Sequence, residues 1–453
     1  MRNQTQPNVV FFLVDNLGMG ELSVYNAGPL RGSTPRIDAF AGEGMRLLNF
    51  APETQCTPSR SALMTGRHSI RSGNQTVTFP GSHGGLVKWE RTMGDIFSEA
   101  GYATACVGKW HIGDSEGRWP TDHGFDEWYG IPRSYDECFW PDDPWYDAKR
   151  DLVTHVLEGR KGEPVHELEQ LTVQVRRDID VEYMKRAKTF LKRSTDAGKP
   201  FFLYFNHSML HLPTTPRPEF KGKTGRGDFA DSLLELDSDF GVLLDYLQEL
   251  GVDENTLVVF AGDNGPEELE PWRGSAGPWE GSYFTGMEGS LRTPALVRFP
   301  KRVPPGGVSN EIVHITDMFT TIVRWAGLET PEDRVIDGVD QRAFFEGRQE
   351  NSNRDGFLYW MGDTLYGVKW RNFKMVLVLQ KTLSDPALHL ATPHLVNLDT
   401  DPRERKAYDF PFLHTWVLEH TGRLITDYQK SLTLEPHIPV GAPLDYVPMR
   451  SKS

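Results

Sequence analysis

Cysteine is scarce in this chain: three cysteines among 453 residues are too few for a disulfide framework. Long apolar runs are absent as well. None reaches the roughly 18 residues that a membrane-spanning helix requires, so we expect no membrane partner. Residues 1–7 lack the apolar core of a secretory signal. Together these absences predict a soluble protein of the cytoplasm.

Basic residues are outnumbered by acidic ones. The chain contains 49 Lys and Arg against 63 Asp and Glu, which gives a net charge of −14. This balance argues against nucleic acid as a partner. An anionic substrate would have to be attracted by a local cluster of positive charge, because the surface as a whole repels it.

Apolar strands alternate with helices over the first three quarters of the chain, which predicts a large α/β domain over residues 1–350. Continuous apolar runs of this kind are typical of buried parallel strands. The expected strands are 9–14, 103–110, 201–205, 256–262 and 295–299, and the expected helices are 34–44, 92–100, 171–194, 228–250 and 317–326.

The pattern changes beyond residue 350. Short strands joined by tight turns are expected there, followed by a helix at 413–429. This part predicts a smaller C-terminal α+β domain over residues 351–453. Its proline-containing tail, from Pro436 onward, could serve as an arm for a partner subunit in a homo-oligomer. The expected strands are 357–361, 365–370, 373–379 and 395–398.

Residues 113–162 lose regular periodicity and are rich in Trp, Tyr and Phe. A long irregular insertion of this kind often forms a lid or a pocket wall. It can equally be a satellite hydrophobic cluster that holds a long loop against the core. The sequence favours neither interpretation.

The stretch from Cys56 to Arg67 is the most informative in the chain. Pro58 suits the first position of a helix, and Gly66 is a natural helix end. Cys56 then lies at a helix N-terminus, where partial positive charge and free N–H groups favour an anion. A cysteine there is either a low-pKa thiolate nucleophile or, as lone cysteines usually are, a small buried apolar residue.

The letters CTPSR at 56–60, followed by LMTGR at 63–67, resemble the signature of the sulfatase family, and the resemblance covers most of the chain. It implies an alkaline-phosphatase-like α/β/α sandwich, with residues 1–350 as the catalytic domain, and hydrolysis of aryl, alkyl or sugar sulfate esters. It also implies that a maturation enzyme oxidises Cys56 to Cα-formylglycine. One hydroxyl of the hydrated aldehyde attacks sulfur, and the second later expels sulfate.

Two Asp-Asn pairs, Asp15-Asn16 and Asp263-Asn264, each follow a buried strand directly. In open α/β sheets the site lies outside the carboxyl ends of the strands, so the pairs should meet. One such pair alone is usually a turn. Their oxygen atoms suit a hard cation, and the resemblance implies that they hold it together with Cys56. Ca²⁺ is the first choice, with Mg²⁺ or Mn²⁺ as alternatives. Many sulfatases carry Asp where this chain has Asn16.

Lys109 and His111 lie two residues apart, so on an extended chain they face the same side. Their context, GKWHIG, resembles a sulfatase motif. This implies that Lys109 contacts sulfate and that His111 holds or deprotonates the formylglycine hydroxyl. His211, in a His-x-Pro context, resembles the histidine that protonates the leaving group, although His207 competes for that role. Arg60, Lys109 and the metal would stabilise developing charge.

One segment departs from the family pattern. Residues 287–294 resemble a segment that many sulfatases precede by a second sulfate-binding lysine, but residues 281–286 contain no lysine. Contacts to sulfate there must come from neutral donors, from another segment, or not at all.

Three other functions fit the same residues. A phosphonate monoester or phosphodiester hydrolase of the same superfamily can use the same nucleophile. A non-catalytic relative would only bind anions or glycans. A cysteine hydrolase would use unmodified Cys56 and need no metal.

Overall fold

The structure is a computed structural model that describes residues 6–26, 28–81, 84–405 and 414–449. An 11-stranded mixed sheet forms its centre, in the order β10-β2-β9-β8-β1-β7-β3-β4-β5-β6 with β11 paired to β2. The strands are β1 (Asn8–Val14), β2 (Met45–Ala51), β3 (Ala103–Gly108), β4 (Glu127–Gly130), β5 (His155–Arg160), β6 (His166–Gln170), β7 (Phe201–His207), β8 (Thr256–Gly262), β9 (Thr293–Arg298), β10 (Gly307–Ser309) and β11 (Val313–His314).

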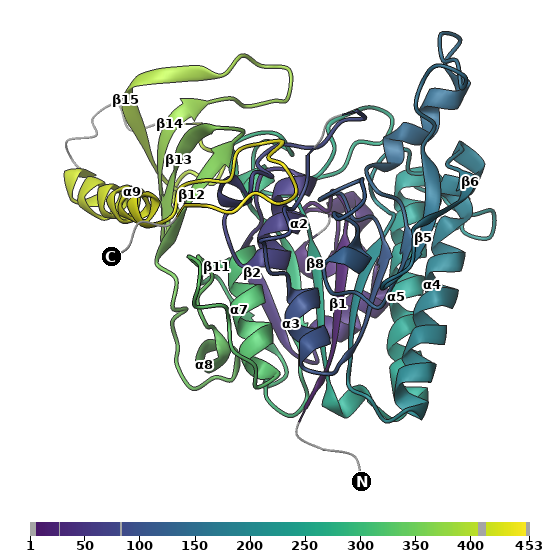
Figure 1. The fold of residues 1–453 in the computed structure, drawn as a ribbon. Helices are drawn as coiled ribbons and strands as arrows, with labels where there is room; N and C mark the ends of the chain where they lie inside the picture. Colours follow the sequence, from purple (N-terminus) through teal and green to yellow (C-terminus); the bar gives the residue numbers. More distant parts are fainter. Residues whose placement is uncertain (1–5, 27, 82–83, 406–413, 450–453) are drawn as a thin grey trace.

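Helices cover both faces of this sheet, and for this reason its central strands are apolar throughout. Alternate residues of β1 point to opposite faces. Val9 and Phe11 pack in one hydrophobic cluster with α2 (Cys56–Thr65), α3 (Met93–Glu99) and α7 (Ile315–Trp325). Val10 and Phe12 pack in another with α1 (Pro35–Ala41), α4 (Val173–Asp196) and α5 (Asp228–Glu249). Figure 1 shows the resulting three layers, which confirm the predicted α/β/α sandwich.

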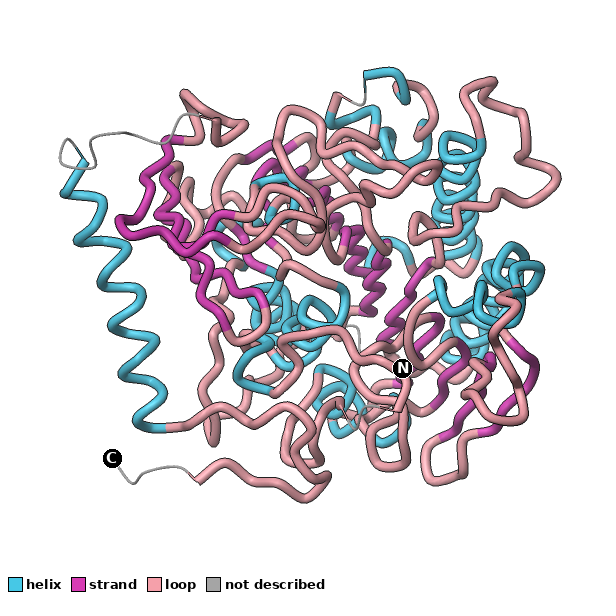
Figure 2. Tube along the Cα trace, turned by 90° about the horizontal axis from the view of Figure 1, so that it is seen from above, coloured by secondary structure: helices cyan, strands magenta, loops and turns pink. Residues whose placement is uncertain are grey.

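A second sheet of four antiparallel strands follows the part of the chain that forms the central sheet, in the order β12-β13-β14-β15. Its apolar face packs against α9 (Thr415–Leu434), where Val417 and Tyr428 meet Leu358, Val368 and Met375. The helix lies along the outer side of this sheet, as the view from above shows (Figure 2). The strands are β12 (Gly356–Met361), β13 (Thr364–Trp370), β14 (Phe373–Leu379) and β15 (Leu388–Asn397).

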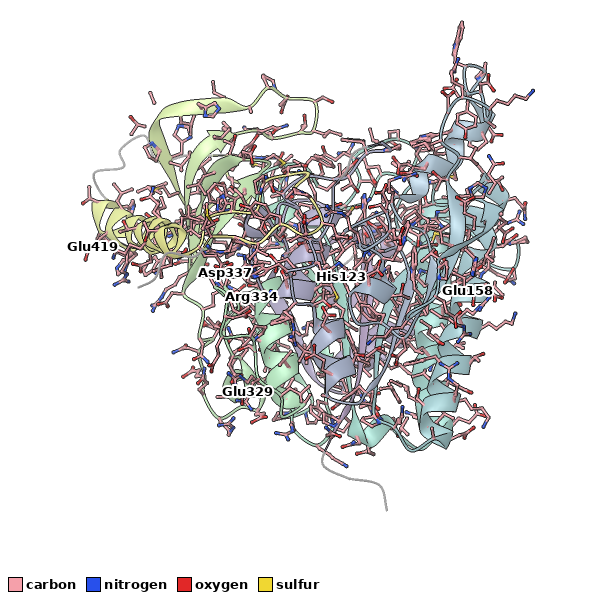
Figure 3. The ribbon with its side chains drawn as sticks, viewed as in Figure 1. His123, Glu158, Glu329, Arg334, Asp337 and Glu419 are labelled. Atoms are coloured by element: carbon pink, nitrogen blue, oxygen red, sulfur yellow. The ribbon has the colours of Figure 1, made fainter. Side chains whose placement is uncertain are left out.

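Buried ion pairs join the two parts. Arg71 links α9 to the first part: its Nε and Nη2 atoms lie 2.8 and 2.9 Å from the carboxylate oxygens of Asp337, and Nη2 also donates to Ser431 Oγ in α9 over 2.8 Å. Asp337 lies between the two parts in Figure 3. Lys369 Nζ donates to Glu288 over 2.6 Å, and both side chains are fully buried. Such paired charges are costly to break, because removing one partner leaves the other buried and alone.

The tail after α9 packs on its own chain. Ile438 N donates to the carbonyl of Arg71 over 2.9 Å, and Arg118 Nη2 donates to the carbonyl of Ala442 over 2.6 Å. Ile438 and Ala442 also share a small hydrophobic cluster with Val87. The tail therefore does not project as the arm that the sequence suggested. A homo-oligomer and a domain boundary at residue 350 remain predictions.

The aromatic insertion belongs mainly to the core. Trp128 in β4 and Phe125 are buried among the side chains beside the central sheet, and Tyr135 is buried on the opposite face. Its tip is exposed, and Trp145 there is 88% accessible. The loops above the sheet cover the carboxyl ends of the strands (Figure 2). Within the described residues, no helix is long and apolar enough to cross a membrane.

Candidate active site

The carboxyl ends of four neighbouring strands meet above the centre of the sheet. Val14, at the end of β1, pairs with His207 of β7 on one side and with Gly262 of β8 on the other. Gly108, at the end of β3, pairs with Asn206. The strands therefore end level with one another. The segments that follow them carry all the predicted site residues except Cys56 and Arg60, which lie on α2.

Helix α2 brings the cysteine to these strand ends. Cys56 is its first residue, following Gln55 in extended conformation, and the helix ends at Gly66 with a left-handed φ of 70°. Pro58 thus occupies the third helical position and not the predicted first, because the helix begins two residues earlier. Cys56 Sγ lies 3.3 Å from Asp15 Oδ1 and 3.9 Å from Asn16 Oδ1.

The surroundings of Cys56 disfavour the thiolate form of its side chain. Burial and the neighbouring carboxylate of Asp15 raise its pKa well above the usual value, and together they outweigh the opposite effects of Lys109 and Arg60. Of the two interpretations of the cysteine, this direction favours the buried side chain over the low-pKa thiolate. The partial charge of the helix end is too small to offset complete desolvation beside a carboxylate.

Arg60 connects several residues of the site through hydrogen bonds. Its Nε and Nη2 atoms lie 3.1 and 2.8 Å from Asp263 Oδ2, and Nη2 is 3.3 Å from Asp15 Oδ2. Its Nη1 atom donates to Asn206 Oδ1 and to the carbonyl of Lys109. Every one of these side chains is fully buried. The guanidinium is thus fixed in position next to the N-terminus of α2, with little freedom to lose when an anion binds.

Lys109 supplies the second buried positive charge. Its Nζ atom donates to Asp15 Oδ2 over 2.7 Å and lies 3.4 Å from Ser134 Oγ. Burial alone would lower the pKa of Lys109, but Asp15 raises it above the usual value. Correspondingly, Lys109, His211 and Arg60 lower the pKa of Asp15 against the effect of burial. The lysine is therefore cationic and the aspartate anionic.

His211 faces the site and His207 does not. Nε2 of His211 lies 3.0 Å from Ser134 Oγ, while its Nδ1 is 2.9 Å from the carbonyl of Leu212. Burial and Lys109 lower the pKa of His211. His207 instead places Nε2 3.2 Å from Asp239 Oδ2, within the layer of α4 and α5. The structure thus brings His211, but not His207, next to Lys109.

His111 and Asn16 share an unusual backbone conformation. Their φ angles are 60° and 55°, in the left-handed region that Asn and His tolerate better than most residues. Nδ1 of His111 is buried and makes no hydrogen bond with the described residues. Burial, Lys109 and Arg60 lower the pKa of His111 well below its ordinary value, so the ring is neutral near pH 7.

The predicted metal ligands converge and fit a hard cation. Asn16 N donates to Asp263 Oδ1 over 3.1 Å, and Asn264 Nδ2 donates to Asn16 Oδ1. Oδ1 of Asn264 is buried without a hydrogen-bond partner among the described residues. Burial and the charge of Asp15 raise the pKa of Asp263, which shows that two carboxylates here are costly without added positive charge. A cation bound to these oxygens would give Asn264 Oδ1 a partner and would supply positive charge next to the two carboxylates.

Comparison with known proteins gives the family. A family model described as Sulfatase matches residues 7–328, and one described as N-sulphoglucosamine sulphohydrolase, C-terminal, matches residues 284–411. The chain belongs to the sulfatase family. Its fold is the alkaline-phosphatase-like α/β fold of that family, and it is an enzyme that hydrolyses sulfate esters, as its sequence predicted.

The relatives match along most of their length. N-acetylgalactosamine-6-sulfatase of Canis lupus familiaris is 32% identical over 467 residues, which cover 94% of this chain and 86% of the relative. Arylsulfatase A of Bos taurus is 34% identical over 431 residues, which cover 88% and 82%. The crystal structure of PsFucS1 sulfatase from Pseudoalteromonas sp. aligns with a TM-score of 0.89 at 29% identity, covering 96% of this chain and 92% of that one.

The sulfatase site also contains three residues that sequence reasoning missed. Ser134 bridges Lys109 and His211, as described above. Glu267 accepts a hydrogen bond from Asn16 Nδ2 and is 1% exposed. Tyr283, in the segment that lacks the lysine, interacts with Glu267 through its hydroxyl. Each lies in a loop, and no spacing in the sequence connects them with the strand ends.

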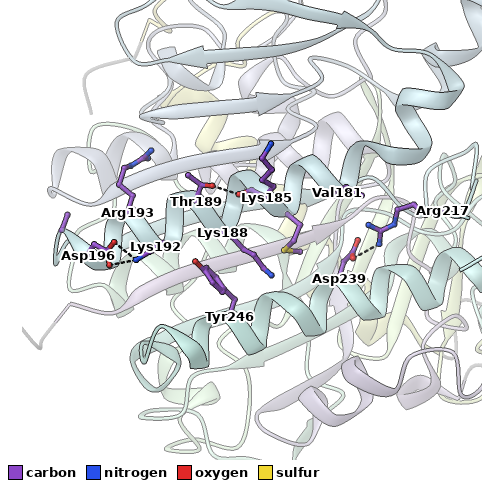
Figure 4. A pocket seen from close by; sticks show the side chains of 12 residues that line it. Val181, Lys185, Lys188, Thr189, Lys192, Arg193, Asp196, Arg217, Asp239 and Tyr246 are labelled. Atoms are coloured by element: carbon purple, nitrogen blue, oxygen red, sulfur yellow. Dashed lines mark hydrogen bonds and ion pairs between the residues drawn. The ribbon is translucent and has the colours of Figure 1, made fainter. Parts of the chain in front are cut away.

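Two other features of the sulfatase lie away from this site. A cavity of about 970 Å³ between α4 and α5 is lined by basic residues, but Lys192 pairs with Asp196 and Lys188 lies over the ring of Tyr246 (Figure 4). Glu53, His68 and His314 form a second buried cluster of potential metal ligands. There, His68 Nδ1 is already 3.0 Å from Glu53 Oε1.

Proposed function

We propose that this sulfatase cleaves an aryl, alkyl or sugar sulfate ester with formylglycine derived from Cys56, next to a cation held by Asp15, Asn16, Asp263 and Asn264. The observation that carries the proposal is the pair of buried cations beside Cys56. In a chain of net charge −14, Arg60 and Lys109 are completely buried beside the N-terminus of α2. With a divalent cation bound next to them, the site would carry the net positive charge that suits a sulfate group.

Conversion of Cys56 is supported by its environment. Because burial and Asp15 raise the pKa of the thiol, the unmodified side chain would be a poor nucleophile at neutral pH. Sulfatases typically use formylglycine, and its hydrate provides two hydroxyl groups on one carbon: one to attack sulfur, and one to lose its proton so that sulfate can leave. A formylglycine-generating enzyme is accordingly the proposed partner in maturation.

The roles of the neighbouring side chains follow from their positions. A divalent cation, with Ca²⁺ as our first choice, would supply positive charge that polarises the sulfate and the hydrate. Lys109 binds a sulfate oxygen through its ammonium hydrogens. Neutral His111 accepts a proton from the hydrate through a ring nitrogen. His211, whose Nε2 faces Ser134, gives a proton to the leaving alcohol or phenol.

Paired substrates test this function against its closest alternative. We expect a higher kcat/KM for an aryl sulfate than for a phosphonate monoester or phosphodiester with the same phenol. The shared phenol keeps leaving-group chemistry constant, so the ratio reports the transferred group alone. A higher value for the phosphorus ester would favour the phosphonate or phosphodiester hydrolase instead. A cytoplasmic location remains a prediction from the sequence.

A further inference from the structure

Asn16 and Glu267 form a buried hydrogen-bonded pair beside the predicted cation site. Nδ2 of Asn16 donates to Oε1 of Glu267, and the two residues are both 1% exposed. Glu267 lies in the loop after β8, three positions beyond Asn264. Glu267 is not part of any sulfatase motif found in the sequence. The next residue, Glu268, is also acidic, which is typical of an exposed turn.

This pair determines which atom of the Asn16 amide faces the cation site. The nitrogen of the Asn16 amide faces Glu267, because Nδ2 donates its hydrogen bond to a carboxyl oxygen of Glu267. The oxygen is thereby turned to the other side. There it lies 3.9 Å from Cys56 Sγ and accepts a hydrogen bond from Asn264 Nδ2. Without Glu267, the amide could rotate and present its N–H groups to the cation.

The carboxyl group of Glu267 also affects the net charge around the proposed cation. The charges of Asp15 and Asp263 are offset by those of Lys109 and Arg60, which pair with them directly. Since residue 16 is an asparagine, these four side chains carry no net negative charge for a divalent cation. Burial and Asp15 raise the pKa of Glu267 to about 8, and a divalent cation bound at Asn16 would favour the ionised form of this carboxyl group.

We propose that Glu267 is a positioning residue of the cation site, which holds the Asn16 amide with its oxygen toward the cation. The inference rests on the cation site of the proposed function and extends it to a residue outside the four predicted ligands. Partners of this kind that orient a ligand typically contribute 10- to 100-fold in metal affinity.

The test measures Ca²⁺ affinity by calorimetry on metal-stripped protein, in two backgrounds. Glu267→Gln should weaken Ca²⁺ binding by about 10- to 100-fold in the wild-type background. In an Asn16→Asp background, residue 16 is already charged and has no N–H group to be held. There the same Glu267→Gln change should not weaken Ca²⁺ binding, because it removes a carboxyl group that would face the new carboxylate at position 16. Asp tolerates the left-handed φ of position 16 nearly as well as Asn.

Glu21→Gln is the matched control. Glu21 is also fully buried, but it accepts its hydrogen bond from the backbone N–H of Ser275, over 3.0 Å. Neutralising it tests whether any buried glutamate near the site affects the cation, and we expect Ca²⁺ affinity within about twofold of wild type. The Ca²⁺-induced shift in melting temperature, taken relative to each variant's own metal-free value, provides an independent reading for all variants.

The outcomes separate this inference from the proposed function. If wild-type protein binds no divalent cation, the cation site itself is wrong. If wild type binds Ca²⁺ but Glu267→Gln binds it equally well, the role of Glu267 is wrong. An equal loss of Ca²⁺ affinity in both backgrounds also overturns the inference, because Glu267 would then act independently of Asn16. Should Glu267→Gln not fold, Glu267→Ser gives the same comparison in both backgrounds.

Discussion

Replacing His211 by alanine should slow the cleavage of poor leaving groups far more than that of good ones. In the structure, Nδ1 of His211 is 2.9 Å from the carbonyl of Leu212, which fixes the ring and leaves Nε2 facing Ser134 and the site. A proton on Nε2 can therefore reach the oxygen of a leaving alcohol. An alkoxide needs this proton, whereas a nitrophenoxide is stable without it.

General acid catalysis contributes about 10²- to 10⁴-fold, which corresponds to roughly 3–5 kcal/mol of transition-state stabilisation. His211→Ala should therefore lower kcat/KM for an alkyl or sugar sulfate by about that factor, and for nitrophenyl sulfate by about tenfold or less. The assay is a series of sulfate esters whose leaving groups span a wide range of pKa. The mutant should show a steeper dependence of rate on leaving-group pKa than wild type.

The pH dependence gives a second readout of the same group. Burial and Lys109 lower the pKa of His211 below its ordinary value of 6.5. The acid form is the protonated one, so kcat/KM for an alkyl sulfate should fall as pH rises through this lowered pKa. His211→Ala should remove that fall. Equal slowing of all leaving groups, or an unchanged pH profile, would refute acid catalysis by His211.

Three further changes test other parts of the account. Asp263→Ala should abolish both Ca²⁺ binding and activity, as measured by metal analysis and by assay, and a variant that keeps its metal would contradict the ligand set. Burial opposes the charge on His207, but Asp180 and Asp239 raise its pKa. Its pairing therefore stabilises the fold fully below about pH 6.5 and is lost as pH rises through the raised pKa. His207→Gln should thus destabilise most at acidic pH in urea titrations; equal destabilisation at alkaline pH would contradict this. Asp337→Asn should lower the free energy of unfolding by about 3–5 kcal/mol, because it leaves Arg71 buried and unpaired; denaturation showing under about 1 kcal/mol would argue against that pair.

The sequence best predicted the strands whose residues are all apolar and buried. The strands β1 and β8 are apolar on both faces, and each was placed within a residue of its observed ends. The strand β6 was missed because its residues are mostly exposed and charged, so it carries no apolar signal. The strand β2 was missed because Arg46 and Asn49 interrupt its apolar pattern.

The residues of the candidate site also fall into two groups, those that the sequence could predict and those that it could not. Residues in short motifs at strand ends, such as Asp15, Lys109 and Asp263, could be grouped from sequence because parallel strands end at one edge of the sheet. Glu267, Ser134 and Tyr283 could not, because each reaches the site through a loop whose path depends on tertiary packing. The sequence also left the direction of the Cys56 pKa shift open, because the burial of the thiol and the nearness of Asp15 cannot be derived from the local helix alone.

The most direct test of the account measures activity against the extent of Cys56 conversion. Conversion of the thiol to the aldehyde lowers the mass of the Cys56 peptide by about 18 Da, so mass spectrometry gives the converted fraction of each preparation. Preparations made with different amounts of maturation enzyme should release sulfate in proportion to that fraction, with a line through the origin. Full activity in a preparation whose Cys56 remains entirely a thiol would contradict the account.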